Sequence, residues 1–508
     1  MKKPKENLRQ RAYLNTVTSF IDYGTKALTS FVVNPFVVNG LGGTLFGVWQ
    51  MLGQITNYSN LADFKASTVL KWAIARDREN VDEEELRKYV TTTFFLVLLM
   101  LPLILIAALA ITWYLPEIVK ISDDYIFTIR VTFLILISSF ILRKFFNVFE
   151  SILAGMNLGF KRMGLRAVIT IIGGGLSVLA IVLDFGLIGL ALVSLTTSLI
   201  IGVTLMIIVK KNVPWFGLSK FSFKQSKMFF KTSGWFMAWS GIQMILTNSD
   251  KVLLGALASP IFVAQYVITT YLPNTIKDIV TQIIGNTLPG MGKLYGNKEF
   301  DKLLSVKRQV FVITWLFCCT IGCIGLIFNH SFVSLWIGED QYAGQFVNLL
   351  LILITIQYMF TYNDGILINI SLNVKKKVYY GAVAALITIL LSILLIEKMG
   401  IIGLCIALIG GRLTMSIAYP IIVAKILDHK INFDLKLFRM MFTMLLLFTF
   451  SYFIGESILI RQWFMLLLLV GVMFLIVLVL SYFIGVTKKE RDDIYNQLIK
   501  IKIFKNRD

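Results

Sequence analysis

The chain has 508 residues, of which 57% are hydrophobic and only 15% are charged. A typical soluble domain is about 25% charged, so this composition excludes an ordinary soluble protein and predicts an integral membrane protein. Lys and Arg outnumber Asp and Glu by 49 to 29, which gives a net charge of +20. The basic residues are scattered over many short polar segments, a distribution that argues against nucleic-acid binding and for attraction to anionic membrane lipids.

Fourteen segments are apolar over a length that can cross a membrane, because a helix needs about 20 apolar residues to span the hydrocarbon core. In chain order their centres lie near Leu28, Ile55, Met100, Leu136, Gly174, Thr197, Met244, Thr275, Cys319, Ile356, Ile389, Gly410, Leu447 and Phe474. Most of the Lys and Arg fall in alternate connections, and the other connections contain only Lys120, Lys398 and Arg461. This asymmetry follows the positive-inside rule and predicts that both termini are cytoplasmic.

Two halves of the chain resemble each other at a nearly constant offset. NPFVVNGLGGTLFGVWQ from Asn34 aligns with DKVLLGALASPIFVAQY from Asp250, and FGLIGLALV from Phe185 aligns with MGIIGLCIA from Met399. We therefore predict an all-α membrane protein of 14 transmembrane helices, with two six-helix lobes related by a parallel pseudo-twofold axis. The predicted parts are an N-lobe at 1–209, a basic cytoplasmic linker at 210–227, a C-lobe at 228–430, and two extra helices with a basic tail at 431–508.

Residues that usually carry catalysis or metal binding are scarce, with two histidines and four cysteines in the whole chain. Cys318, Cys319 and Cys323 lie in one apolar segment and Cys405 lies in another. Free cysteines are among the most buried side chains, so we interpret these four as small core residues, with a metal site of the first three as the alternative. We expect no catalytic residue, no metal and no cofactor.

Ionisable residues inside the predicted spans are the candidate functional residues, since a charge in the membrane is costly unless it faces water or a partner. Lys26, Lys277 and Arg412 fall near mid-span, and we interpret them as cations that line a cavity, with structural ion pairs as the alternative. Arg143 and Lys144 are further cationic candidates that can equally extend to the cytoplasmic interface. The candidates for ion coupling or structural charge are Asp22, Glu150, Asp250, Lys251, Asp278 and Asp364.

For two pairs of these candidates, the spacing along the chain predicts how the side chains point on a helix. Asp22 and Lys26 are four residues apart, so they share a helix face and can form an ion pair. Asp250 and Lys251 are adjacent and point about 100° apart on a helix, so each is expected to have its own partner. We place them toward the outer end of the seventh span, where Asp250 faces the interior of its lobe; ion coupling by Asp250 is the alternative.

Four stretches resemble segments of bacterial polysaccharide flippases. They are NSDKVLLGALASPIFVAQY from Asn248, LGGTLFGVWQMLGQITNYSNLADF from Leu41, NTLPGMGKLYGNKEFDKL from Asn286 and LWIGEDQYAG from Leu335. They are similar to the helix 7–8 signature, the helix 2 pattern, the segment after helix 8 and the outer segment after helix 9, respectively. Over essentially its whole length, the chain resembles the Wzx-type polysaccharide transporter branch of the multidrug/oligosaccharidyl-lipid/polysaccharide (MOP) exporter superfamily.

This resemblance implies a V-shaped, two-lobed fold with a central cavity and alternating access. It implies a flippase that moves oligosaccharides linked to undecaprenyl pyrophosphate across the bacterial cytoplasmic (inner) membrane, for a surface polysaccharide such as capsule or the O-antigen of lipopolysaccharide. It also implies H+ or Na+ as a coupling ion, and a polysaccharide polymerase and chain-length proteins as partners. Mid-span cations would offset the desolvation of the pyrophosphate. Relatives commonly have Arg at such sites, so Lys at two of the three positions is a departure.

Three other functions are the alternatives. A lipid II flippase moves the peptidoglycan precursor, but its first helix is typically richer in Arg than the one that contains Lys26. A MATE-like exporter of cations or drugs needs an acidic or aromatic cavity, whereas mid-span bases here match or outnumber the acids. A membrane polymerase or ligase needs a large outer segment with catalytic residues, and none here exceeds about a dozen residues. We therefore predict that the chain is not an enzyme.

Overall fold

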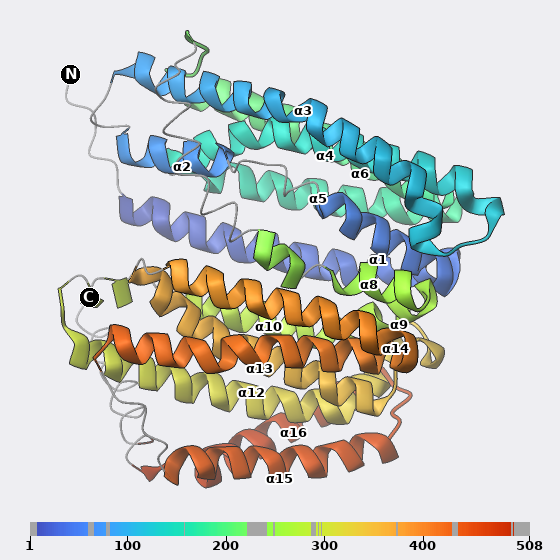
Figure 1. Cartoon of the computed structure of the whole chain (residues 1–508), viewed down its shortest axis with the longest axis vertical. Coiled ribbons are helices and arrows are strands. Elements are labelled where there is room, and N and C mark those ends of the chain that lie inside the picture. Colours follow the sequence, from blue (N-terminus) through green and yellow to red (C-terminus); the bar gives the residue numbers. More distant parts are fainter. Residues whose placement is uncertain are drawn as a thin grey trace. The chain divides into compact units, whose positions relative to one another are not determined.

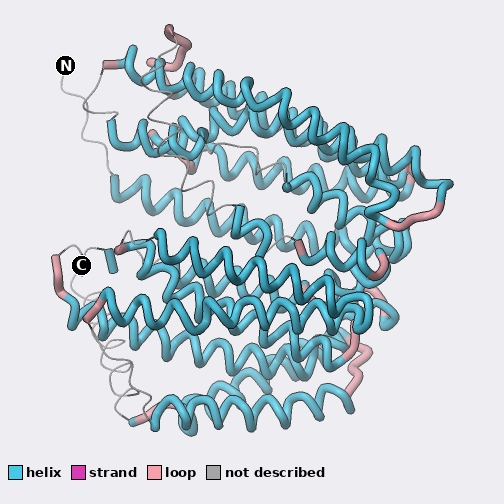
Figure 2. The backbone as a smooth tube through the Cα atoms, viewed as in Figure 1, coloured by secondary structure: helices cyan, strands magenta, loops and turns pink. Residues whose placement is uncertain are grey.

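The computed structural model of the chain contains helices and no strands in the residues it describes (Figure 2). These residues are 8–58, 66–77, 82–156, 158–220, 241–246, 249–285, 291–292, 294–295, 297–371, 374–428, 435–488 and 491. They divide into two compact units, Met1–Val263 and Ala264–Asp508, which are described separately below. The predicted lobes at 1–209 and 228–430 have other boundaries and stay a prediction.

Unit 1 consists of long helices from the first half of the chain (Figure 1). They are α1 (Leu8–Tyr58), α2 (Ala66–Asp77), α3 (Glu83–Val119), α4 (Ile126–Gly155), α5 (Phe160–Val182), α6 (Gly186–Asn212) and α8 (Asp250–Leu257), with a short 3-10 turn at Asp123–Tyr125. α4 packs against α6, and α5 packs against α1 and α6. The core of α2, α3, α4 and α6 contains the fully buried residues Leu70, Ile74, Val90, Ile152 and Val209.

Unit 2 is built from the remaining helices (Figure 1). They are α10 (Tyr271–Gly285), α12 (Phe300–Trp336), α13 (Gln345–Ile370), α14 (Val374–Ile426), α15 (Leu435–Ser457) and α16 (Trp463–Leu480), with short turns at Glu339–Gln341 and Ser481–Gly485. α9 (Pro260–Thr269) crosses the boundary between the units. α13 packs against α14, and α12 packs against α13, α15 and α16. The four cysteines are buried and free, as small core residues should be.

Ten of the described helices are long and apolar enough to cross a membrane. Their outer surfaces expose large apolar side chains, such as Phe464 and Leu467 on α16, which water would not tolerate over so wide an area but lipid would. The chain is therefore a multi-pass membrane protein. The predicted seventh span, centred near Met244, lies partly on 228–240 and 247–248, outside the described residues, so the count of fourteen stays a prediction.

α14 contains two of the predicted spans. Its 53 residues would be about 80 Å long as a straight helix, far more than the roughly 30 Å hydrocarbon core. Gly400 interrupts the helix with φ +55°, a left-handed conformation that glycine adopts at little cost. A Cβ on Gly411 would lie 2.7 Å from the carbonyl oxygen of Ala384, and one on Gly403 would lie 2.6 Å from the carbonyl carbon of Leu395. The two arms of α14 therefore run antiparallel, as a helical hairpin that turns at Gly400.

Candidate functional site

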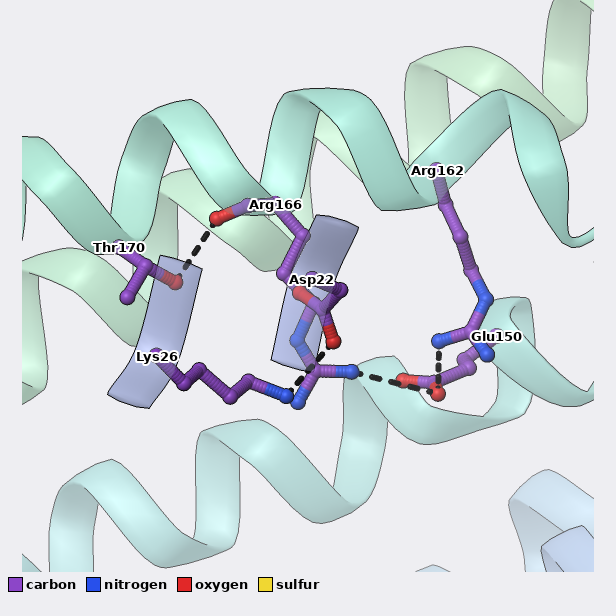
Figure 3. Close-up of polar contacts among 6 residues, drawn as sticks. All are labelled: Asp22, Lys26, Glu150, Arg162, Arg166 and Thr170. Atoms are coloured by element: carbon purple, nitrogen blue, oxygen red, sulfur yellow. Dashed lines mark hydrogen bonds and ion pairs between the residues drawn. The ribbon is translucent and has the colours of Figure 1, made fainter. Parts of the chain in front are cut away.

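Two charged residues of α1 form an ion pair in unit 1 (Figure 3). Lys26 Nζ donates a hydrogen bond to Asp22 Oδ2 at 2.7 Å. Asp22 is the more buried partner, with 14% of its side chain exposed against 44% for Lys26. The other carboxylate oxygen, Asp22 Oδ1, is buried without a hydrogen-bond partner among the described residues. The contact expected from the spacing is present, and its acidic member keeps an unused acceptor.

The carboxylate of Glu150 on α4 pairs with two arginines of α5 (Figure 3). Arg162 Nη1 donates to Glu150 Oε1, and Arg166 Nη1 lies 3.6 Å from the same oxygen. From the charge pattern alone, both arginines are expected in a basic connection between the fourth and fifth spans. α5 instead begins at Phe160 and carries them in its first two turns. Glu150 is thus held between two cations inside the helical bundle.

The packing of α1 on α5 brings these two ion pairs to the same level of unit 1. Gly174 of α5 lies against Thr29 of α1, and Gly40 of α1 lies against Ile181 of α5. Both sequence numbers increase in the same direction, so the two helices run parallel, and Asp22 lies near the level of Arg166. We refer to Asp22, Lys26, Glu150, Arg162 and Arg166 as the unit 1 charge cluster; its side chains carry one net positive charge when all are ionised.

The cationic candidates Arg143 and Lys144 lie on α4 about two turns before Glu150. Arg143 is exposed. Lys144 Nζ lies 5.2 Å from the ring centroid of Phe140, one turn away on the same helix, which is a cation–π distance. The Lys144 ammonium therefore reaches back toward the start of α4, and the roles of both cations stay predictions.

Asp250 and Lys251 begin α8, which packs against α1 within unit 1. Lys251 Nζ donates to Gln50 Oε1 of α1 at 3.0 Å. Asp250 Oδ1 accepts a hydrogen bond of 2.9 Å from the backbone N–H of Lys251, as an acidic residue in the first turn of a helix can do. Gly255, one turn further, leaves room for Met51 of α1. The Lys251 ammonium thus has a partner on α1, whereas the direction expected for Asp250 stays a prediction.

In unit 2, two of the three mid-span cations meet at one aromatic ring. Lys277 Nζ on α10 lies 5.4 Å from the ring centroid of Tyr358 on α13, and Arg412 Cζ on α14 lies 5.9 Å from the same centroid. Both distances fall within the about 6 Å over which a ring attracts a cation. Lys277 Nζ also donates to Asn274 Oδ1 at 2.8 Å and lies 3.7 Å from Asp278 Oδ1. We refer to Lys277, Tyr358 and Arg412 as the tyrosine site.

A cavity of about 270 Å³ lies among α10, α12, α13 and α14 in unit 2. At its wall Lys307 Nζ of α12 lies 3.1 Å from Asp364 Oδ1 of α13. Gln357 and Asn363 also line the cavity, and their side-chain oxygens are buried acceptors without a hydrogen-bond partner in the described part of the chain. Carboxylate and amide oxygens are ligands that suit a small hard cation. The residues that line the cavity therefore include one paired carboxylate and two amides with unused oxygens.

Sequence reasoning missed four residues of these sites. Arg162, Arg166 and Lys307 were assigned to basic connections, because hydropathy detects only the part of a helix inside the hydrocarbon core. Tyr358 was passed over because an aromatic residue in an apolar span usually belongs to the core. One feature of the sequence could have identified the arginines as a site: they are four residues apart, which places both on one face of a helix.

The comparisons with known proteins identify the family. The profile of the family described as polysaccharide biosynthesis protein matches residues 14–295, more than half of the chain. The chain belongs to this family. A comparison with curated protein sequences gives no match.

Solved membrane transporters share the fold of this polysaccharide biosynthesis protein. The lipid II flippase MurJ, in an inward closed conformation, has a TM-score of 0.68 at 15% identity and covers 92% of this chain and 99% of its own. An inward-facing multidrug resistance MATE family transporter of the MOP superfamily has a TM-score of 0.60 at 12% identity, covering 81% and 96%. A Vibrio cholerae MATE transporter has a TM-score of 0.56 at 15% identity, covering 83% and 98%.

These identities are low, so the likeness concerns the fold. The family match agrees with the resemblance to polysaccharide transporters that the sequence motifs indicated, and the fold is the one that MurJ and a MATE transporter of the MOP superfamily share. The proteins that share this fold are a flippase and transporters rather than enzymes, in agreement with the prediction that the chain is not an enzyme.

Proposed function

We propose that the chain flips oligosaccharide repeat units linked to undecaprenyl pyrophosphate from the inner to the outer leaflet of the bacterial cytoplasmic membrane. The observation that carries this proposal is the tyrosine site, where Lys277 and Arg412 from two helices contact one ring in a member of the polysaccharide biosynthesis protein family. The pyrophosphate is a strongly charged part of every such substrate. Ammonium and guanidinium groups form charge-assisted hydrogen bonds with phosphate oxygens, which offset its desolvation.

The unit 1 charge cluster supports the same function from the other unit. Lys26 has 44% of its side chain exposed, so its ammonium can reach a phosphate without complete desolvation. Its partner Asp22 stays largely buried and holds the ammonium in place. In our proposal the predicted lobes 1–209 and 228–430 alternate access to the two leaflets, with both termini in the cytoplasm and any polymerase and chain-length proteins acting on the product.

Asp364 is our candidate for coupling transport to an ion gradient. Its carboxylate pairs with Lys307 at the wall of a cavity that Gln357 and Asn363 also line, each with a buried side-chain oxygen that has no hydrogen-bond partner among the described residues. A proton or Na+ that binds there would compete with the Lys307 ammonium for the same carboxylate. Asp364→Asn should abolish the dependence of export on the ion gradient, while Lys307→Gln should change that dependence without removing it. Wild-type gradient dependence in Asp364→Asn would refute this role.

The main experiment measures export of surface polysaccharide in a strain that lacks this protein. The strain is complemented with wild type, with a Lys277→Gln/Arg412→Gln variant, or with Lys26→Gln. The matched control is Lys120→Gln/Lys398→Gln, which removes two positive charges from exposed positions outside both sites. We expect the site variants to lose most export and to accumulate lipid-linked units on the inner leaflet, at expression equal to wild type, while the control exports normally.

Normal export by both site variants would overturn the assignment of these cations. Lipid II carries the same pyrophosphate anchor, so a lipid II flippase is the alternative cargo assignment. It predicts arrested peptidoglycan synthesis in the deletion strain, with surface polysaccharide lost only as a consequence. A MATE-like exporter predicts sensitivity to cationic drugs instead, with surface polysaccharide intact.

A further inference from the structure

A basic groove lies at the open end of the α14 hairpin, opposite the turn at Gly400. It has a volume of about 570 Å³. Its lining residues come from the start of the first arm and the end of the second arm: Lys375, Lys376, Tyr379, Tyr380, Ala418, Ile421, Ile422 and Lys425. Three lysines and no acidic residue line it, so its charge is strongly positive. The antiparallel packing of the arms places these residues together although about 50 residues separate them along the chain.

The position of the groove along the helix matches the headgroup layer of a membrane. About 25 residues separate Lys375 from Gly400, which corresponds to about 38 Å of helix and exceeds the roughly 30 Å hydrocarbon core. When Gly400 lies at one interface, the lysines therefore reach the polar layer at the other. The positive-inside rule predicts that this end is cytoplasmic, where anionic lipid headgroups attract basic residues.

The neighbouring Lys377 shows that this lysine run has two separate roles. Lys377 is buried, and its ammonium donates to the carbonyl oxygen of Gly365 at 3.2 Å and to Asn369 Oδ1 at 3.0 Å. It thereby holds the end of α13 against the start of α14. Lys375 and Lys376 are exposed, as is Lys425, and no ion pair joins these three to an acidic side chain within the described residues. Their ammonium groups are available to a ligand.

The groove combines these charges with an apolar floor. Ile422 and Ala418 are buried, and Ile421 is exposed, so the floor continues outward as an apolar surface that can accommodate an acyl chain. Tyr379 and Tyr380 stand at the rim with ring centroids 5.3 Å apart. Tyrosines are enriched at membrane interfaces because the ring is apolar and the hydroxyl is polar. Phosphate-binding cations next to an acyl-binding surface are the chemistry of a phospholipid site.

We propose that this groove is a specific binding site for an anionic glycerophospholipid of the cardiolipin type. Its two phosphates bind Lys375, Lys376 and Lys425, and an acyl chain lies on Ala418 and Ile421. Basic pockets between helices at the cytoplasmic side are the usual sites for such headgroups. A bound lipid would link the two arms of α14 at their open end, where no turn connects them. This role is independent of which cargo the protein carries.

The test is a titration of the purified full-length chain in detergent with cardiolipin, followed by native mass spectrometry. The variant is Lys375→Gln/Lys376→Gln/Lys425→Gln. The matched control, Lys210→Gln/Lys211→Gln/Lys220→Gln, removes three exposed lysines from unit 1 and leaves the groove intact. A surface lysine contributes about 1 kcal/mol to binding an anionic lipid, so we expect the groove variant to bind on the order of 100-fold more weakly. The single variant Lys425→Gln should bind about 5-fold more weakly.

Three outcomes would overturn the proposal. The first is a groove variant that binds within twofold of wild type. The second is an equal loss of affinity in the control, which would indicate diffuse attraction. The third is displacement of cardiolipin by inorganic pyrophosphate at the same concentration, which would indicate a soluble-anion site. Retention of cardiolipin by wild type and control, loss in the groove variant, and weak binding of phosphatidylcholine by all three would support the site. Helical circular dichroism and elution volume must match for all variants, because the substituted side chains are exposed.

Discussion

The ring of Tyr358 gives the sharpest test of how this protein holds its mid-span cations. Two cation–π contacts, at 5.4 Å to Lys277 Nζ and 5.9 Å to Arg412 Cζ, converge on one ring. Such contacts contribute about 0.5–2 kcal/mol each, and about 1 kcal/mol is a suitable value for these half-buried side chains. Tyr358→Leu removes both contacts and keeps the site apolar. The two cations then lose about 2 kcal/mol of positioning, which corresponds to about a 30-fold weaker site.

The assay is transport of an undecaprenyl-pyrophosphate-linked oligosaccharide into proteoliposomes that contain the purified chain. We expect Tyr358→Leu to raise the half-saturating substrate concentration about 30-fold, and Tyr358→Phe to stay within about 3-fold of wild type because the ring remains. Tyr362→Leu is the matched control. The Tyr362 ring stacks on Tyr358 with centroids 6.0 Å apart, and its replacement by Leu removes a similar apolar area.

The results of these variants distinguish an effect of the aromatic ring from an effect of the hydroxyl group or of helix packing. An unchanged half-saturating concentration in Tyr358→Leu would refute the idea that the ring positions the cations. An equal defect in Tyr358→Phe would assign the effect to the hydroxyl group, and an equal defect in Tyr362→Leu would assign it to general packing of α13. Thermal unfolding in detergent, measured on all four proteins, shows whether any of them is misfolded.

The remaining predictions concern stability and are measured as thermal unfolding midpoints in detergent. Gly411→Ala places a Cβ 2.7 Å from a backbone oxygen of the facing arm of α14 and should destabilise by about 1–3 kcal/mol, whereas Gly471→Ala, which meets nothing within 4 Å among the described residues, should not. Glu150→Gln leaves two α5 arginines without their carboxylate and should cost about 1–3 kcal/mol; an unchanged midpoint would mean that water already neutralises them. Asn329→Ala removes hydrogen bonds of 2.9 Å to a backbone oxygen and 2.8 Å to Asn348, both in the core, and should cost about 1–3 kcal/mol; a loss below 0.5 kcal/mol would contradict this.

Hydropathy predicted much of the fold because the bilayer fixes the length of each element. The predicted spans centred at Ile389 and Gly410 became the two arms of α14, and the turn falls at Gly400, two residues after a lysine assigned to an outer connection. The same reasoning could not place helix ends. α5 and α12 extend beyond the hydrocarbon core, so Arg162 and Lys307 are helical although their local sequence is polar. Tertiary partners stabilise these ends, and a hydropathy window cannot detect partners.

The candidate site was predictable in its charges and not in its contacts. Because a buried charge is costly, the sequence predicts that Lys277 and Arg412 each need a partner. Several carboxylates could serve, and the sequence does not indicate which of them is the partner. The structure brings both to Tyr358, a residue without a charge. Asp22 and Lys26 were predictable as a pair because a single helix fixes their geometry. Contacts within one helix follow from spacing, whereas contacts between helices depend on packing.

The unit 1 charge cluster and the tyrosine site stabilise their cations in different ways, and this difference bears on anion binding. In the unit 1 charge cluster, Arg162 and Lys26 each face a carboxylate, so a phosphate must displace an anion that already neutralises them. At the tyrosine site the shared partner is a neutral ring, which a phosphate need not displace, and the Asp278 carboxylate lies 3.7 Å from Lys277 Nζ, farther than the 2.7 Å that separates Lys26 from Asp22. A cation–π contact is also weaker than a charge-assisted hydrogen bond to phosphate, so the exchange favours the phosphate. We therefore expect the pyrophosphate to bind first at Lys277 and Arg412, and charge loss there to impair transport more than the loss of Lys26.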